Sequence, residues 1–498
     1  MEFLLRLGSR LANRYAVAIA LILLIGFGYA YVTGLSPAAR GNLLHGAQEY
    51  LPLVMFITLG VLLFTGYPVA FILGGIALLF GLLGYFLGTF KIVHFFNFLP
   101  RIWGQAAENL VLVAIPTFIF MGVMMERSGI AQDLLYCVQV ILKRVPGALA
   151  LGVTIMGTIL AAMTGIIGAS VTMMTALALP TMIRQGYSHA LSCGTIAAAG
   201  TLGILIPPSI MLIVMADLLS VSVGNLFSAA LVPGLTLALM YLLFIFFAAK
   251  LRPSLAPPLP PDLLTVPKGK MAPLLWRAFF PPVFLIGLIK LSILLGWATP
   301  SEAGAVGAAG AIALAALWGR LNFKMMDAVC QSSARTISMV FFIIISATCF
   351  ALVYRQLGGD DLVERMIKGA GLGSWGFVIL VMLIVFFLGF FLDWIEITLI
   401  VLPVFAPLVK FLDFGTHVPQ EDVVYWFLIL LAVNLQTSFL TPPFGFALFY
   451  MKGIAPKEVK IQSIYRGIVP FVIIQAIGVI LVMAFPQLAL WLMKVTYE

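Results

Sequence analysis

Long apolar runs separated by short polar stretches dominate this sequence. About 20 apolar residues suffice to cross a bilayer as a helix, so the pattern predicts an all-α polytopic membrane protein. The first run, Tyr15 to Val32, follows three arginines and lacks a small-residue cleavage site. We interpret residues 1–50 as an extra retained anchor and loop, and the basic flank predicts a cytoplasmic N-terminus.

One apolar run, Ala190 to Ala216, contains residues that an unbroken membrane helix would not carry. These are Gly200, Thr201, Gly203, Pro207, Pro208 and Ser209. Each proline removes a backbone donor and clashes with the carbonyl four residues before it. Freed backbone groups are tolerated at membrane depth only where they are buried in protein or line a polar cavity. The stretch therefore predicts a helix that breaks inside the membrane.

A second stretch, Gln436 to Gly445, repeats this chemistry inside the run Val423 to Met451. Each Pro-Pro stretch is preceded by a long run that is itself interrupted, at Thr164 to Ser170 and at Gly389 to Glu396. A single break could merely shape packing, but two matched sets predict an internal repeat. Inverted repeats with broken helices are a common plan of secondary transporters, whose binding sites lie at the breaks.

A proline-rich, basic linker at residues 250–277 divides the chain into two halves and is expected in the cytoplasm. Before it we expect scaffold helices and an interfacial helix (residues 51–109) and a first transport repeat (110–249). After it we expect further scaffold helices (278–334) and a second repeat ending in a C-terminal span (335–498). Gly304, Gly307 and Gly310 predict close helix packing in the second scaffold segment.

Composition supports a membrane protein. The 498 residues are 62% hydrophobic and 9% charged, whereas soluble domains have about 25% charged residues. The net charge of +9 comes from short loops and flanks, where it sets orientation and does not indicate nucleic-acid binding. The four cysteines and four histidines have no metal-site spacing, and no phosphate loop or nucleophile elbow is present. We therefore expect no enzyme activity and no cofactor.

Ionisable residues within membrane segments are costly, so they are functional candidates by default. Asp393 is the best candidate, and Glu396 lies one helical turn later, where the two carboxylates could share a face. A solvated loop at the membrane edge is the alternative. Asp217 and Glu302 lie at segment ends, where solvated or capping roles are expected.

The glycines and hydroxyls of the breaks suit a hard monovalent cation, because freed carbonyls and hydroxyl oxygens can replace its water shell. The matching pairs are Gly165 to Ser170 with Gly200 to Pro208, and Gly389 to Asp393 with Gln436 to Pro443. An anionic substrate would then be held between the breaks by hydroxyls and helix N-termini.

Five motifs resemble the large membrane subunit of the tripartite ATP-independent periplasmic (TRAP) transporters of bacteria and archaea. They are Ile115–Gly122, Glu126–Ile130, Gly200–Ser209, Thr299–Ala303 and Gly389–Asp393. The resemblance runs from about Leu51 to the C-terminus. It implies an elevator-type, sodium-coupled importer of an organic acid in the bacterial inner membrane. It also implies two partners, a small membrane subunit and a periplasmic substrate-binding protein.

By position, the resemblance implies a sodium site that includes Ser170, Gly203, Ile206 and Pro208. It implies that Asp393, Gln436 and Thr441 belong to the ion and substrate region of the second half. The full set of expected ion-binding residues is Gly165, Gly168, Ser170, Gly203, Ile206, Pro208, Gly389, Gln436, Thr437 and Thr441. The expected substrate or coupling residues are Asp393, Thr201, Ser209 and Ser438.

The chain departs from the family pattern in its extra N-terminal span, in the few hydroxyls of residues 164–170 and in Phe444 after the second Pro-Pro pair. Ion stoichiometry, substrate size and the choice between sodium and protons therefore stay open. A stand-alone ion-coupled organic anion transporter is the first alternative. A membrane-embedded enzyme would need clustered catalytic residues, and a channel would need a continuous polar pore.

Overall fold

The computed structural model describes residues 37–165, 167–258, 275–276, 279–369, 371–442 and 445–497. The predicted anchor, most of the linker, Ile166, Pro443 and Phe444 lie outside these ranges. Every regular element within them is a helix, which confirms the all-α class. Eight of these helices are long and apolar enough to cross a membrane. They are α2 (Pro37–Leu63), α3 (Val69–Phe86), α9 (Ile167–Arg184), α12 (Val223–Leu251), α15 (Pro300–Leu317), α16 (Phe323–Gln356), α20 (Val423–Leu440) and α22 (Ile461–Ala484).

The first half contains a helical hairpin followed by a broken helix. Helices α8 (Ala148–Thr164) and α9 form the hairpin, whose tip lies at Gly165. Helix α10 (His189–Thr201) continues as the short 3-10 helix η2 (Leu202–Ile204), and after a non-helical stretch the chain resumes as α11 (Ile210–Leu219). The predicted break at the first Pro-Pro pair is therefore confirmed.

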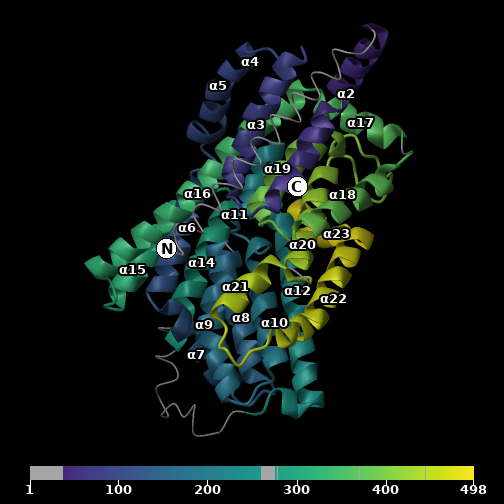
Figure 1. Cartoon of the computed structure of the whole chain (residues 1–498). Helices are drawn as coiled ribbons and strands as arrows, with labels where there is room; N and C mark the ends of the chain where they lie inside the picture. The colour runs from purple at the N-terminus through teal and green to yellow at the C-terminus, as the bar shows by residue number, and fades with distance from the viewer. Residues whose placement is uncertain are drawn as a thin grey trace, which may run out of the picture.

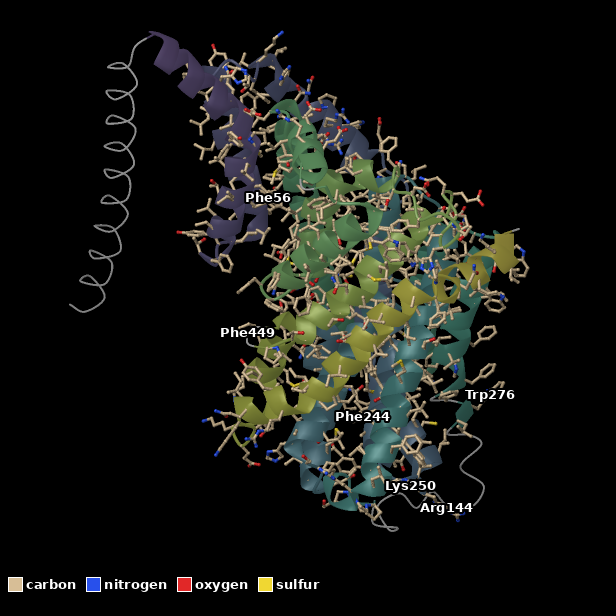
Figure 2. All side chains as sticks on the ribbon, turned by 90° about the vertical axis from the view of Figure 1, so that its right-hand side faces the viewer. Phe56, Arg144, Phe244, Lys250, Trp276 and Phe449 are labelled. Atoms are coloured by element: carbon tan, nitrogen blue, oxygen red, sulfur yellow. The ribbon has the colours of Figure 1, made fainter. Side chains whose placement is uncertain are left out.

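We use the two ends of helix α12 to define the two faces of the molecule. Its 29 residues extend over about 43 Å at 1.5 Å per residue. It ends beside η3 (Pro253–Leu255), and Figure 2 shows Arg144 and Lys250 at this same end. We call this end the linker face. The backbone N–H of Ser188 donates to the Leu255 carbonyl at 2.9 Å. The base of the first hairpin and the start of α10 therefore lie at the linker face.

The second half repeats this plan from the opposite face. Helices α18 (Ser374–Leu388) and α19 (Trp394–Val409) form a hairpin with its tip at residues 389–393. Lys410, after α19, lines the same cavity as Ser220, which lies just before the start of α12. Helix α20 is broken before α21 (Phe446–Ile454). The two hairpins thus enter from opposite faces (Figure 1), which confirms the predicted inverted repeat.

Glycines bring the remaining helices close together. A Cβ atom at Gly304 of α15 would overlap the Thr117 hydroxyl of α6 (Ala114–Arg127), and one at Gly310 would lie 2.5 Å from a Leu285 methyl of α14 (Phe280–Leu294). The predicted close packing is therefore confirmed. Glu302 accepts from the Thr299 N–H at 2.8 Å in a capping box that starts α15, as its position at a segment end predicts.

Shorter helices complete the fold. The predicted interfacial segment consists of α4 (Val93–Phe96), α5 (Phe98–Ile102) and η1 (Trp103–Ala107), and none of their residues is buried. The others are α7 (Ile130–Leu142), α17 (Gly359–Gly369) and α23 (Gln487–Tyr497).

Candidate transport site

The tip of the second hairpin lies against the break that ends α20. A Cβ atom at Gly389 would overlap the Ser438 hydroxyl, and Ser438 itself is fully buried. Asp393 starts α19 by accepting from the Trp394 N–H at 2.7 Å, and Glu396 accepts from the Asp393 N–H at 2.9 Å. The two carboxylates are therefore close, as predicted, but they form a capping box at the helix start.

Three hydroxyls at and just after the C-terminal end of α20 donate to backbone carbonyls of the same segment. Thr437 donates to the Val433 carbonyl at 3.4 Å, Ser438 to Leu435 at 2.8 Å, and Thr441 to Thr437 at 2.6 Å. A hydroxyl that gives its proton to a carbonyl keeps its oxygen lone pairs for a cation or a donor. Thr437 and Thr441, predicted to bind an ion, and Ser438, predicted to contact the substrate, therefore keep the oxygen lone pairs that those roles would need.

Gln436 is fully buried, and neither its amide nitrogen nor its amide oxygen has a protein partner. The indole nitrogen of Trp394 and the hydroxyl of Thr398, both on the neighbouring α19, are also fully buried without a partner. Leaving such a group unsatisfied costs about 1–3 kcal/mol. Buried polar groups concentrated on two packed helices are expected to contact water, an ion or a substrate.

In the first half, the hairpin tip packs against the first broken helix. Gly165 reverses the chain with φ of 58°, and a Cβ atom there would lie 3.0 Å from Ile210, the first residue of α11. A Cβ atom at Gly200 would lie 2.5 Å from a methyl group of Val171, and Ser170 is buried beside Val171. The tip of the first hairpin, with Gly165 and Ser170, thus lies against the end of α10 and the start of α11.

The proline pair frees carbonyl groups in the first break. Pro207 and Pro208 have no N–H, so the carbonyls of Gly203 and Ile204 lose their helical donors. Ser209 Oγ donates to the Ile204 carbonyl at 2.6 Å and so replaces the lost donor of that carbonyl. The Gly203 carbonyl has no such replacement among the described residues, and its role as a cation ligand stays a prediction.

Thr201 and Ile206 face helices outside the first hairpin. Thr201 Oγ1 donates to the Ala198 carbonyl at 2.9 Å and accepts from Gln475 of α22 at 3.5 Å. The Ile206 side chain packs against Gly234 of α12, where a Cβ atom would lie 2.8 Å from it. Any ion contact of Ile206 would therefore use its backbone carbonyl.

Tyr450 joins the two hairpin tips, and sequence reasoning missed it. A Cβ atom at Gly168 would lie 2.9 Å from its ring, and its hydroxyl is within electrostatic reach of Asp393 and Glu396. The available signal was its position in α21, directly after the second break. The segment η2 also packs against both α8 and α20, so all four breaks meet in one region.

Four helices begin in this region, namely α9, α11, α19 and α21. Helix N-termini carry partial positive charge and exposed N–H groups, so together they favour an anion between the breaks. Two hairpins and two broken helices that converge from opposite faces define the class of the protein. It is a secondary transporter built on inverted repeats.

Comparison with known proteins identifies the family. Residues 56–488 match the DctM component of the tripartite ATP-independent periplasmic transporters, so the chain belongs to that family. It is 29% identical over 388 residues to the C4-dicarboxylate TRAP transporter large permease protein DctM of Pseudomonas aeruginosa. That alignment covers 78% of this chain and 87% of the relative.

One further relative and one solved structure are also similar to this chain. The 2,3-diketo-L-gulonate TRAP transporter large permease protein YiaN of Escherichia coli is 26% identical over 384 residues, which cover 74% of this chain and 83% of that protein. The crystal structure of the Alcanivorax borkumensis YdaH transporter superposes with a TM-score of 0.53 at 14% identity. It covers 80% of this chain and 87% of YdaH, and it shows likeness of fold alone.

Proposed function

We propose that this chain is the permease subunit of a sodium-coupled importer of an organic acid in a bacterial inner membrane. A small membrane subunit would pair with it, and a periplasmic binding protein would deliver the substrate. Membership in a family of tripartite transporters supports both partners. The relatives named for a C4-dicarboxylate and for 2,3-diketo-L-gulonate support an organic acid.

The buried Gln436 amide, without a protein partner beside the tip of the second hairpin, is the observation that carries the proposal. One sodium ion would bind near Gln436 with oxygens of Gly389, Thr437 and Thr441. A second would use backbone or hydroxyl oxygens of the first half. Those residues are Gly165, Gly168, Ser170, Gly203, Ile206 and Pro208.

The carboxylate of the substrate would lie between the breaks, near the four helix N-termini. Ser209 and Ser438 would contact this carboxylate, together with Thr201 at the end of α10. Asp393 would couple substrate to ion, because its carboxylate lies at the tip of the second hairpin, where α19 begins. A bound cation would offset the repulsion between this carboxylate and an anionic substrate.

Transport would follow an elevator motion, in which both hairpins and both broken helices slide against α3, α6, α15 and α16. The basic residues at the linker face favour the cytoplasm for that side. They include Arg184, Lys250, Arg252, Lys457 and Lys460.

The deciding experiment is uptake of candidate organic acids into proteoliposomes with the small subunit and the cognate binding protein under a sodium gradient. We expect Gln436→Ala to raise the half-saturating sodium concentration about tenfold or more, since a buried polar ligand contributes about 1–3 kcal/mol. Gln462→Ala on α22, whose side chain is exposed, should leave that concentration unchanged. Size-exclusion profiles would verify folding of both variants.

Ser170→Ala and Asp393→Asn would test the first ion site and the coupling residue in the same assay. Uptake by this chain alone would contradict the tripartite proposal and favour a stand-alone carrier. Uptake driven by a proton gradient without sodium would overturn the proposed ion sites.

A further inference from the structure

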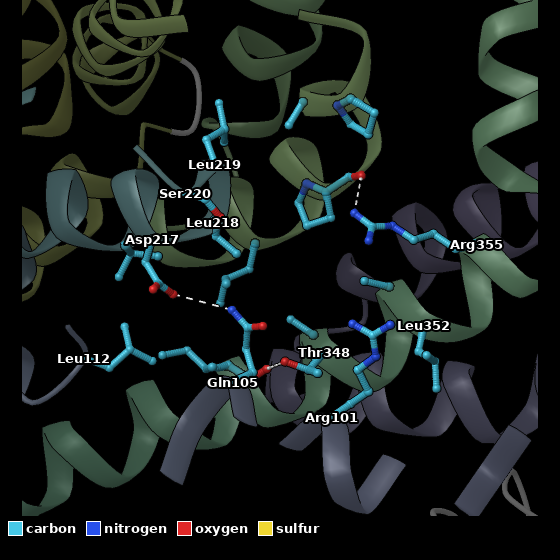
Figure 3. Close-up of a pocket in the computed structure, with 18 of the residues that line it drawn as sticks. Arg101, Gln105, Leu112, Asp217, Leu218, Leu219, Ser220, Thr348, Leu352 and Arg355 are labelled. Carbon is cyan, nitrogen blue, oxygen red and sulfur yellow. Dashed lines mark hydrogen bonds between the residues drawn. The ribbon is translucent and has the colours of Figure 1, made fainter. Parts of the chain in front are cut away.

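A cavity of about 430 Å³ lies at the face opposite the linker face, away from the four breaks. Helices α5, α11, α16 and α19 and the segment η1 contribute its walls (Figure 3). Lys410 at this cavity and Asp393 at the hairpin tip are separated by the whole length of α19, about 24 Å at 1.5 Å per residue. The volume is within the range of small-molecule sites, about 300–1,000 Å³.

The cavity has an excess of positive charge. Arg101, Arg355 and Lys410 line it from three different elements, and Asp217 is the one carboxylate among its lining residues. Figure 3 shows Arg101 and Arg355 on one side of the opening and Asp217 on the other. Asp217 accepts from Asn109 at 2.7 Å and from Gln105 at 3.4 Å, so amide groups occupy its oxygens.

Two of the three cations have no protein counterion. Arg355 donates to the Pro403 carbonyl at 3.3 Å and lies 3.8 Å from Asp360. The side chains of Arg101 and Lys410 make no hydrogen bond or ion pair with any residue in the described part of the chain. Apolar walls such as Leu112, Ile344 and Leu399 strengthen the field of these charges.

We propose that this cavity is an entry site for dianionic carboxylates, in which Arg101, Arg355 and Lys410 hold the substrate before it reaches the breaks. Guanidinium groups bind carboxylates with two parallel hydrogen bonds, and an ammonium group adds a point charge. A dianion matches the charges of Arg101 and Lys410, the two lining cations that have no protein counterion in the described part of the chain, whereas a monoanion compensates only one of them. The proposal rests on the proposed function, because it concerns the substrate of that transporter.

Arg355 and Lys410 also lie at the ends of helices, where cations offset the partial negative charge of the C-terminus. That role alone would alter thermal stability without altering the affinity for a dianion. A binding experiment that requires no transport therefore separates the two roles.

The first test places a cysteine in the cavity by Thr348→Cys, in a Cys330→Ser background that removes the one exposed cysteine in the described part of the chain. Membranes containing the chain and its small subunit would be labelled with a maleimide in the presence of succinate or its monoamide, succinamate. We expect succinate to slow labelling about fivefold or more and succinamate to slow it less than about twofold, because the monoamide lacks one of the two charges.

Lys410→Gln and Arg101→Gln should each abolish most of the succinate protection, whereas Lys324→Gln, outside this cavity, should preserve it. Absence of protection by succinate would overturn the entry site. Protection that survives both substitutions, or is lost equally with Lys324→Gln, would also overturn it.

The second test measures initial uptake rates by the complete transporter. Lys410→Gln should raise KM for the dianionic substrate about tenfold at low ionic strength with kcat unchanged, and the difference should shrink as salt is added. A KM equal to that of the wild type would contradict the entry site. If the complete transporter shows no uptake while succinate still protects the introduced cysteine from labelling, the proposed function fails and the anion site stands.

Discussion

Gly389 at the tip of the second hairpin lies so close to Ser438 at the end of α20 that a single added methyl group would overlap the serine hydroxyl. This contact fixes the hairpin tip against the second break. It also explains why glycine starts the sequence Gly389 to Asp393, because any other side chain would push Asp393 away from α20.

Gly389→Ala should therefore displace the tip and destabilise the protein by about 1–3 kcal/mol, as overpacking in a tight core does. Uptake should fall more than expression, since the tip carries Asp393. Ser438→Gly in the same chain should restore much of the thermal stability by making room. Gly453→Ala in α21 is the matched control, because nothing lies within 4 Å of its added methyl group. Failure of the double variant to recover stability would show that the contact is not the cause.

Gly194 of α10 and Gly467 of α22 bring two helix backbones into direct contact. A Cβ atom at Gly194 would overlap the Gly467 carbonyl, and one at Gly467 would overlap the Ala190 carbonyl. No rotamer change can relieve a clash with backbone atoms. Gly194→Ala should therefore lower the free energy of unfolding by about 3 kcal/mol or more, the upper end of the usual overpacking effect. Thermal unfolding in detergent would measure this.

Gly287→Ala in α14 provides the control for Gly194→Ala, because open space surrounds its added methyl group. Alanine favours helix over glycine by about 0.8–1.0 kcal/mol, so this variant should be neutral or slightly more stable. Equal losses in the two variants would contradict the backbone contact.

The sequence predicted the breaks well because their cause is local. Proline removes a donor wherever it occurs, so the Pro207–Pro208 pair predicts an interruption without knowledge of the partners. The inverted arrangement also followed from the order of the breaks in the two halves. The carboxylates of Asp393 and Glu396 were predicted to be neighbours, but their shared role at the helix start depends on where α19 begins.

Contacts between distant segments could not be predicted in this way. Tyr450 meets Gly168 across 282 positions of sequence (450 less 168), and only the packed fold brings α21 to the first hairpin. The cavity lined by Arg101, Arg355 and Lys410 likewise forms only when distant helices pack together. Each cation ends a separate helix, where a solvated position would be the ordinary expectation.

A charged interaction at the other end of the molecule links α7 to the turn between α15 and α16. Arg320 forms an ion pair with Asp133 at 2.7 Å and donates to the Ser128 carbonyl at 2.9 Å. Both side chains are partly exposed, so the ion pair itself should contribute about 0.2–1 kcal/mol. Asp133→Asn should therefore lower the unfolding temperature slightly.

Arg320→Gln should lower the unfolding temperature more than Asp133→Asn, because it also removes the bond to Ser128. A double-mutant cycle at low and high salt measures the pair, whose coupling should weaken as salt is added. A coupling energy near zero at low salt would show that the ion pair contributes nothing.

Asp360 in α17 provides a pH-dependent prediction outside the membrane spans. Its Oδ1 atom is buried without a partner, and its Oδ2 atom lies 3.8 Å from Arg355. Burial raises the pKa of Asp360, the charge of Arg355 opposes this rise, and Asp361 adds to it. Because the folded protein disfavours the ionised carboxylate, stability is present below the pKa of the unfolded chain and is lost as pH rises through the folded pKa.

Asp360→Asn removes this ionisation, so its unfolding temperature relative to the wild type should increase as pH rises from about 4, near the pKa of an unfolded aspartate, through the raised pKa of the folded protein. Arg355→Gln should enlarge the loss of stability over the same range, since Arg355 is the charge that opposes the rise in the pKa of Asp360. Differential scanning fluorimetry of the three proteins across this range would measure both effects. A gap between Asp360→Asn and the wild type that stays constant with pH would rule out the raised pKa.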